Sequence, residues 1–375
     1  MKKLFLHVGY HKTGTSALQY FFWNNCATLN RFGFYYPKTG LEGYSHGKLA
    51  NIIKPNNRDR RLEKTRAKFH KEVNYKRVRN VIISSEVFLE GWNVSQATKE
   101  FLTSLECDVK IIFYLRNQGH WLESVYNEVI RDPIRRYTGD LHDLREYKHG
   151  YHNYDLMVDN WASAFGDNAI VLFEYDNKGD RNDIFYNILD CFGINEYGEF
   201  DFSMDDRRSN VRFHPLMTEF LRRINRFGMM RNQYLEVQEE LYEISKNMYR
   251  EHGKEYYSNL EEEEIKWLIE NYSRKNNILF KKYTGKDGVT LFDGYDEKKT
   301  ALSAKTQLTP KFQHIIFDSF SARSKRTLEQ ASVAIRKREP GKHFLNIPPR
   351  DTVLRLDEVI MRQRFELRKL YGLVK

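Results

Sequence analysis

Short apolar runs alternate with amphipathic stretches along the first two hundred residues of the chain. The run KLFLHVGY and residues 81–83, 109–115 and 169–175 are mostly apolar, which is typical of buried strands. The stretches between them repeat apolar residues at helical spacing, as Trp121, Val125 and Val129 do. Buried strands alternating with helices predict an α/β fold with a doubly wound, mostly parallel sheet.

From residue 215 to about 283 the pattern becomes strongly helical, and we expect these helices to cap or flank the sheet. Two more helical patterns begin near Thr309 and Asp351, on either side of the breaker-rich segment EPGKHFLNIPP. The last pattern carries a narrow apolar seam that we expect to pack on the main domain. Its members are Val353, Leu356, Ile360, Leu367 and Leu370.

The first apolar run leads through GYHKTGTS directly into the helical segment SALQYFFW. Backbone N–H groups at a helix N-terminus have no helical partner and attract anions, so the turn at Thr13, Gly14 and Thr15 is a candidate anion site. Gly14 allows close approach of the backbone, and Lys12 adds a positive charge. The usual nucleotide-phosphate loop, GxxxxGK[ST], requires lysine at position 15, where this chain has threonine.

This order of residues resembles the 5′-phosphosulfate loop of sulfotransferases that use 3′-phosphoadenosine 5′-phosphosulfate (PAPS), and GYHKTGTSALQ is most similar to their bacterial glycan-sulfotransferase branch. A second segment strengthens the resemblance: Arg116 ends an apolar strand and Ser124 follows eight residues later on a helix. Such a pair holds the 3′-phosphate of PAPS in that family, and arginine suits phosphate because it donates two hydrogen bonds at once. The residues that the resemblance implies for the phosphosulfate are His11, Lys12, Thr13, Gly14, Thr15 and Ser16.

Glu86 follows the apolar strand 81–83 and is our first candidate for the catalytic base. Glycan sulfotransferases place a glutamate between the two PAPS segments, so the resemblance implies that Glu86 takes the proton of the acceptor hydroxyl. His46 is the alternative base, since its ordinary pKa near 6.5 suits proton transfer. Lys12 is expected to stabilise the leaving phosphate during in-line transfer.

The resemblance implies a PAPS-dependent sulfotransferase that sulfates a saccharide hydroxyl in a polysaccharide, lipopolysaccharide or lipo-oligosaccharide precursor and releases adenosine 3′,5′-bisphosphate. It requires no metal. The sequence identifies neither the acceptor sugar nor the sulfated position, and an anionic or a lipid-linked acceptor are both open. The aromatic residues of GFYYPKTGLEGYSHG, together with Trp92, are candidates to stack on sugar rings. The resemblance covers residues 1–295, including the helical subregion 215–283, and leaves residues 296–375 as a helical C-terminal extension.

The net charge of +10 is concentrated at the end of the chain. Residues 301–375 hold 16 lysines and arginines against 7 acidic residues, whereas the preceding 300 residues are almost neutral. A basic face there would contact an anionic acceptor or a membrane surface, or serve as an oligomer contact, and nucleic acid is the least expected partner. A solvated helix face remains the alternative.

Cys26, Cys107 and Cys191 are isolated, with neither a CxxC pair nor metal-ligand spacing, and are expected to be buried free thiols. The apolar stretch at the N-terminus is too short for a signal sequence, and no run reaches the length of a membrane span. We therefore expect a cytoplasmic protein, either free or peripheral at the membrane.

Two other functional classes remain open. A P-loop kinase or NTPase would need a lysine at position 15 and an acidic Mg²⁺ ligand after a strand, for which Glu86 is only a loose substitute. A non-catalytic polyanion-binding protein would explain the basic extension. It would not explain the ordered loop, the candidate base and the Arg116 and Ser124 pair in the body of the chain.

Overall fold

The computed structural model describes residues 2–54, 60–75, 79–90, 94–175, 183–195, 202–204, 213–252, 257–286, 302–309, 313 and 316–338. The chain forms two compact units. The first comprises Met1–Trp121, Lys148–Asn210 and Lys266–Tyr295, and the second comprises Leu122–Tyr147, Val211–Ile265 and Asp296–Lys375.

The first unit contains a five-stranded sheet in the order β2-β3-β1-β4-β5, and all its pairings are parallel. The strands are β1 (Lys3–His7), β2 (Phe34–Tyr35), β3 (Asn80–Ser84), β4 (Asp108–Leu115) and β5 (Ile170–Glu174). The α/β fold with a parallel sheet is thus confirmed, and the four predicted runs form β1, β3, β4 and β5. Because β1 lies between β3 and β4, the carboxyl ends of these three strands are adjacent, where open α/β sheets bind ligands.

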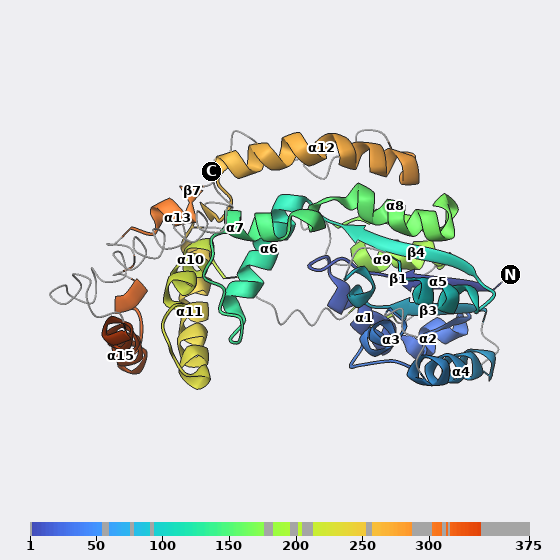
Figure 1. Ribbon diagram of the computed structural model, residues 1–375, viewed down its shortest axis with the longest axis horizontal. Coiled ribbons are helices and arrows are strands. Elements are labelled where there is room, and N and C mark those ends of the chain that lie inside the picture. Colours follow the sequence, from blue (N-terminus) through green and yellow to red (C-terminus); the bar gives the residue numbers. More distant parts are fainter. Residues whose placement is uncertain are drawn as a thin grey trace. The chain divides into compact units, whose positions relative to one another are not determined.

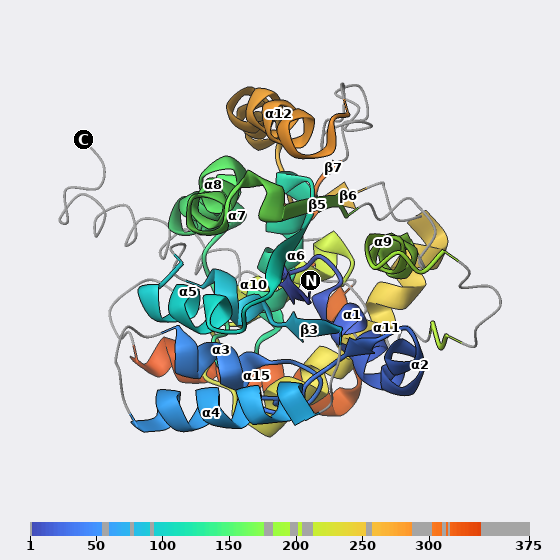
Figure 2. The ribbon, with the colours of Figure 1, turned by 90° about the vertical axis from the view of Figure 1, so that its right-hand side faces the viewer.

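Helices cover both faces of this sheet (Figures 1 and 2). On one face, Phe5, Ile112 and Tyr114 pack in a core with residues of α1 (Thr15–Asn24), α2 (Cys26–Arg31) and α9 (Asp183–Cys191). On the other side Figure 2 shows α5 (Gln96–Thr103) and α8 (Tyr154–Phe165), and α8 contacts β4 and β5. The other α-helices that include described residues of this unit are α3 (Gly47–Ile53), α4 (Arg60–Tyr75), α6 (Gln118–Arg131) and α12 (Glu262–Thr284).

The predicted helices between residues 215 and 283 are confirmed as α10 (Pro215–Ile224), α11 (Arg231–His252) and α12. Helices α10 and α11 belong to the second unit, while α6 and α12 each contain residues of both units. The second unit also contains α7 (Leu141–Tyr147), α13 (Ala304–Gln307), α15 (Ala322–Arg338) and a short parallel pair, β6 (Tyr257–Ser258) with β7 (Leu302–Ser303).

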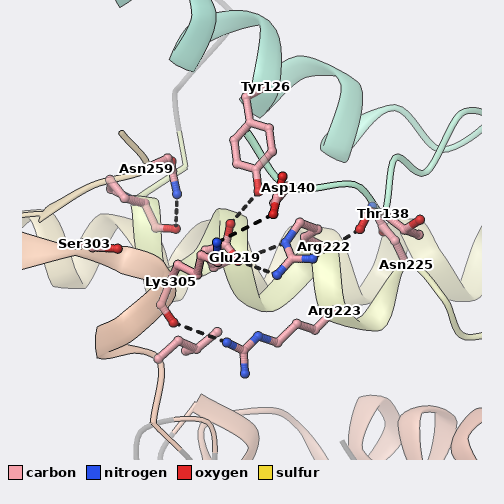
Figure 3. A network of polar contacts seen from close by, with 12 residues as sticks. Tyr126, Thr138, Asp140, Glu219, Arg222, Arg223, Asn225, Asn259, Ser303 and Lys305 are labelled. Atoms are coloured by element: carbon pink, nitrogen blue, oxygen red, sulfur yellow. Dashed lines mark hydrogen bonds and ion pairs between the residues drawn. The ribbon is translucent and has the colours of Figure 1, made fainter. Parts of the chain in front are cut away.

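A buried ion pair lies inside the second unit (Figure 3). Glu219 accepts hydrogen bonds from Nε and Nη2 of Arg222, both at 2.9 Å, and another from the hydroxyl of Tyr126. Arg222 also donates to the backbone oxygen of Thr138 at 3.2 Å. Burial opposes ionisation of Glu219, but the guanidinium and the hydrogen bonds outweigh it and lower the pKa of this carboxyl. The network is therefore a structural element of this unit.

The beginning of the C-terminal extension is part of the second unit. Leu308, Phe320 and Leu328 are buried, and the ammonium group of Lys305 lies 3.6 Å from a carboxylate oxygen of Asp140. Residues 339–375, which include the predicted apolar seam from residue 353 to residue 370, lie outside the described residues.

Truncation should separate these two parts of the extension. We expect a chain ending at residue 300 to be destabilised by several kcal/mol, because each buried leucine or phenylalanine that it loses contributes about 1.5–3 kcal/mol. Urea denaturation measures the effect, and a chain ending at residue 338 is the control because it keeps Leu308, Phe320 and Leu328. Equal denaturation midpoints for the two truncated chains would contradict the packing role of residues 302–338.

Candidate functional site

The loop that joins β1 to α1 has an unusual backbone. Gly9, Lys12 and Gly14 have positive φ angles of 56°, 67° and 75°. Thr13 is fully buried, and both its backbone N–H and its hydroxyl donate to the carbonyl oxygen of Tyr10, at 3.2 and 2.5 Å. Helix α1 then begins at Thr15 with no acidic residue in its first turn and, among the described residues, no side chain that caps it. Its first N–H groups therefore keep the positive partial charge of an uncapped helix start.

The two glycines of this loop are required by the space around them. A Cβ on Gly14 would lie 2.7 Å from Cδ1 of Ile184 and 2.9 Å from the Tyr175 ring. A Cβ on Gly9 would lie 2.6 Å from Cγ2 of Thr15. Since both positions also have positive φ, an L side chain at either would strain the loop. The spacing of five residues between the glycines thus has a structural cause.

Arg116, which directly follows β4, reaches this loop. It is 8% exposed, and its Nη1 donates to the backbone oxygen of Lys12 at 3.1 Å. The guanidinium carbon lies 5.6 Å from the centre of the Tyr175 ring, and the hydroxyl of Tyr154 donates to the backbone oxygen of Arg116 at 2.7 Å. The structure therefore brings together two predicted segments that are separated by 104 residues.

The other predicted residues of the loop differ in exposure. His11 and Lys12 are half-buried, Thr15 is buried, and Ser16 is exposed on the first turn of α1. Ser124 is half-buried on α6, in the part of this helix that belongs to the second unit. Its role beside Arg116 stays a prediction.

Glu86 lies beside the same loop. Strand β3 ends at Ser84, the backbone N–H of Ser85 donates to the backbone oxygen of His7 at 3.0 Å, and Glu86 then begins the short 3₁₀ helix η1 (Glu86–Leu89). One carboxylate oxygen, Oε2, accepts a hydrogen bond from Nε2 of Gln19 on α1 at 2.7 Å. The Cα of Glu86 lies 3.6 Å from the position that a Cβ on Gly9 would occupy. The candidate base is thus half-buried and adjacent to the loop.

His46, the alternative base, is fully buried. Its Nε2 donates to the backbone oxygen of Pro37 at 2.9 Å, and its Nδ1 accepts from the backbone N–H of Ser84 at 3.2 Å. Because a carbonyl oxygen can only accept, the ring is the neutral Nε2–H tautomer. Burial lowers the pKa of His46 to about 4. Both ring nitrogens are used by the backbone, and this geometry favours Glu86 over His46 as the base.

His7 is a second buried histidine, and the sequence alone did not single it out. It ends β1, has no exposed surface, and its Nδ1 lies 2.7 Å from the hydroxyl of Ser84. Burial lowers the pKa of His7 to about 3. The sequence feature that could have indicated this residue is its place as a polar side chain inside the apolar run KLFLHVGY. His7, Ser84 and His46 form a connected set of buried polar groups at the ends of β1 and β3.

The two histidines predict that the protein loses stability in acid. Their pKa values are lower in the folded chain than the ordinary 6.5, so below pH 6.5 the unfolded chain binds more protons. The stability that each neutral histidine contributes is complete above pH 6.5. It falls as the pH drops towards the pKa in the folded chain, which is about 4 for His46 and about 3 for His7. We expect a loss on the order of 2 kcal/mol per histidine between pH 7.5 and 4.5.

Urea denaturation at a series of pH values measures this loss. The substitution His46→Asn, which keeps a donor and an acceptor but does not titrate, should make the dependence on pH less steep. An unchanged pH dependence in this variant would show that His46 is not the titrating group.

Within the residues described above, no three histidine, cysteine or acidic side chains gather in a way that could hold a metal ion. Cys26, Cys107 and Cys191 are free thiols, as predicted, but all three are half-buried and not fully buried as expected. Partial burial raises the pKa of Cys191 to about 11. None of the helices in the described ranges combines the length and the apolar character that crossing a membrane requires.

Comparison with known proteins does not identify this chain. No family model matches it, and no solved structure matches it. A curated protein of Archaeoglobus fulgidus, described as "Uncharacterized protein", is 30% identical over 210 residues, which are 55% of this chain and 54% of that protein. The chain spans about half the length of this curated relative.

Proposed function

We propose that this protein is a sulfotransferase that moves a sulfuryl group from PAPS to the hydroxyl of a saccharide. The observation that carries the proposal is the hydrogen bond of 3.1 Å between Nη1 of Arg116 and the backbone oxygen of Lys12. It joins the two segments in which the sequence resembles PAPS-binding motifs. Arg116 would hold the 3′-phosphate, while the loop around Gly14 would hold the phosphosulfate.

The loop between β1 and α1 suits the anionic end of this substrate. Gly14 lets the backbone approach the ligand, and the start of α1 directs N–H groups towards an anion. His11, Lys12, Thr13, Thr15 and Ser16 are the proposed neighbours of the sulfuryl group and the phosphate to which it is attached. Among them Lys12 supplies a full positive charge, which would stabilise the oxygen that leaves with adenosine 3′,5′-bisphosphate.

Glu86 is the proposed base. The acceptor hydroxyl attacks sulfur as the bond between sulfur and the phosphate oxygen breaks, and Glu86 takes the hydroxyl proton. The hydrogen bond from Gln19 holds Oε2, so Oε1 is the oxygen proposed to take the proton. The leaving group keeps the electron pair of the broken bond, and its new negative charge lies beside Lys12 and the helix start. Positioning and electrostatics supply most of such catalysis, as in phosphoryl transfer.

The basic extension is proposed as a surface for an anionic acceptor. Residues 301–375 carry nine more positive than negative side chains. Arg323, at the start of α15, is exposed and pairs with Glu236 at 2.7 Å. Exposed basic side chains raise the local concentration of anions, and salt screens this effect.

Adenosine 3′,5′-bisphosphate should stabilise the pure protein against heat. A ligand that binds only the folded chain adds about 2.7 kcal/mol at a concentration one hundred times its Kd, which corresponds to a shift of several degrees in Tm. ATP lacks the 3′-phosphate and should have a much smaller effect. A thermal denaturation series with both nucleotides measures the difference. Equal stabilisation by ATP would favour a kinase or NTPase over a sulfotransferase.

The activity itself is tested by incubating the protein with PAPS labelled in the sulfuryl group and with glycan extracts of the host. Label recovered in a saccharide fraction, together with adenosine 3′,5′-bisphosphate, would support the proposal. If the nucleotide binds but no label moves to any fraction, the assignment of a saccharide acceptor is wrong.

A further inference from the structure

Three aromatic side chains of the first unit lie together at its surface. Trp23 is 40% exposed, Tyr44 is 43% exposed and Tyr20 is half-buried. The ring centres of Tyr20 and Tyr44 are 5.0 Å apart, and those of Trp23 and Tyr44 are 6.2 Å apart. Tyr20 and Trp23 are three residues apart on α1 and therefore share one face of this helix. We call Tyr20, Trp23 and Tyr44 the aromatic platform.

Tyr44 is held in place by the backbone around it. Glu42 and Ser45 exchange two backbone hydrogen bonds, at 2.8 and 3.1 Å, so that Tyr44 lies in a tight turn after Gly43, whose φ is 59°. The hydroxyl of Tyr36 donates to the backbone oxygen of Tyr44 at 2.7 Å. The backbone that carries the exposed ring is thus held in place, which reduces the entropy that ordering this segment would cost on binding.

Both segments that carry the platform also contact the region of the candidate base. On α1, Gln19 precedes Tyr20 and donates to Glu86 at 2.7 Å. After the turn, the backbone N–H of His46 donates to the backbone oxygen of Ser84 at 2.8 Å, two residues before Glu86. The platform therefore belongs to the same part of the first unit as the proposed acceptor hydroxyl.

Exposed aromatic rings with polar edges suit sugars. One face of a pyranose ring presents C–H groups that pack on an aromatic ring, while the tyrosine hydroxyl and the indole N–H can bond the sugar hydroxyls at the ring edges. We propose that the aromatic platform binds a sugar ring of the acceptor saccharide, adjacent to the ring whose hydroxyl faces Glu86. The second half of this statement rests on the proposed function, whereas saccharide binding by the platform does not.

Saccharide binding can be measured without PAPS. An array of neutral and anionic oligosaccharides of hexoses and N-acetylhexosamines identifies a probe that the native protein retains, and calorimetric titration gives its Kd. We expect Trp23→Ala and Tyr44→Ala to raise this Kd at least tenfold. Tyr44→Phe keeps the ring and should stay within about threefold of the native protein.

Tyr147→Ala is the matched control, because Tyr147 is an even more exposed tyrosine, at 78%, that belongs to the second unit. It should leave the Kd unchanged. Urea denaturation of all four variants should give midpoints close to that of the native protein, which shows, without any nucleotide, that the chain remains folded.

The results distinguish the platform from the proposed activity. If the native protein retains no saccharide, or if the alanine variants bind the retained probe as tightly as the native protein, the platform is not a sugar site. Saccharide binding that depends on Trp23 and Tyr44, in a protein that binds no adenosine 3′,5′-bisphosphate, would support the platform and contradict the sulfotransferase proposal. If both alanine variants transfer the sulfuryl group with an unchanged KM for the acceptor, the result would support the sulfotransferase proposal and contradict sugar binding by the platform.

Discussion

Replacing Glu86 with glutamine is expected to lower turnover on a saccharide acceptor by about a hundredfold or more, the usual contribution of a positioned base. Glutamine has nearly the same size, and its amide oxygen can still accept the hydrogen bond from Gln19, but it cannot take a proton. The binding of adenosine 3′,5′-bisphosphate should therefore stay unchanged. Steady-state kinetics with PAPS and a saccharide acceptor give the turnover, and thermal denaturation with the nucleotide gives the binding.

Glu90→Gln is the matched control for this substitution. Glu90 directly follows η1, its side chain is exposed, and it pairs with Lys54 at 3.4 Å, a surface contact that contributes little. Its removal should leave turnover within about twofold of the native value. If Glu86→Gln turns over normally while His46→Asn is inactive, although it is folded and binds the nucleotide, the base is His46.

Replacing Gly14 with alanine should weaken the binding of adenosine 3′,5′-bisphosphate at least tenfold and also destabilise the folded chain. The left-handed backbone at this position costs an L residue about 1–2 kcal/mol. The new methyl group would also crowd Ile184 and Tyr175, so the loop would have to move. Since Arg116 lies over the Tyr175 ring, the change would reach the proposed phosphate site as well. Calorimetric titration with the nucleotide measures the affinity.

Gly193 provides a control for the cost of the left-handed backbone without the steric crowding. Gly193 has a φ of 73°, almost the same as Gly14, but a Cβ there would meet nothing within 4 Å. Gly193→Ala should therefore lose stability from the backbone and keep full affinity for the nucleotide. If the two alanine variants lose the same stability and both keep full affinity, the loop at Gly14 does not hold the nucleotide.

The parts of the fold that could be predicted are those with apolar or amphipathic segments several residues long. Strands β1, β3 and β4 are largely buried, and the edge strand β5 alternates buried with half-buried residues, so all four stand out in the sequence. The amphipathic helices α10, α11 and α12 stand out as well. Strand β2 was missed because it has only two residues, Phe34 and Tyr35, which are too few to form a recognisable strand pattern. Strand order and the division into two units depend on long-range packing that no local pattern contains.

The spacing of residues in the sequence predicted the candidate site better than the chemical type of single residues did. The glycines of the loop and the place of Arg116 at a strand end followed from motifs, and the structure brings them together. The environment of His46 could not be predicted, because its burial and its partners, Pro37 and Ser84, depend on the folded chain. Of the aromatic residues considered for sugar binding, Tyr44 is exposed, Tyr36 is buried and supports the turn, and Trp92 lies outside the described residues.

The way in which the chain is shared between its units limits how the protein can be dissected. The chain passes from one unit to the other five times, and two of these passages, at residues 121–122 and 265–266, fall within α6 and α12. No single cut therefore releases the parallel sheet with all its helices, and neither unit corresponds to one continuous expression fragment. A complementation experiment that supplies the protein as two polypeptides would have to divide it in a connection between elements, at a position where both pieces keep every helix whole.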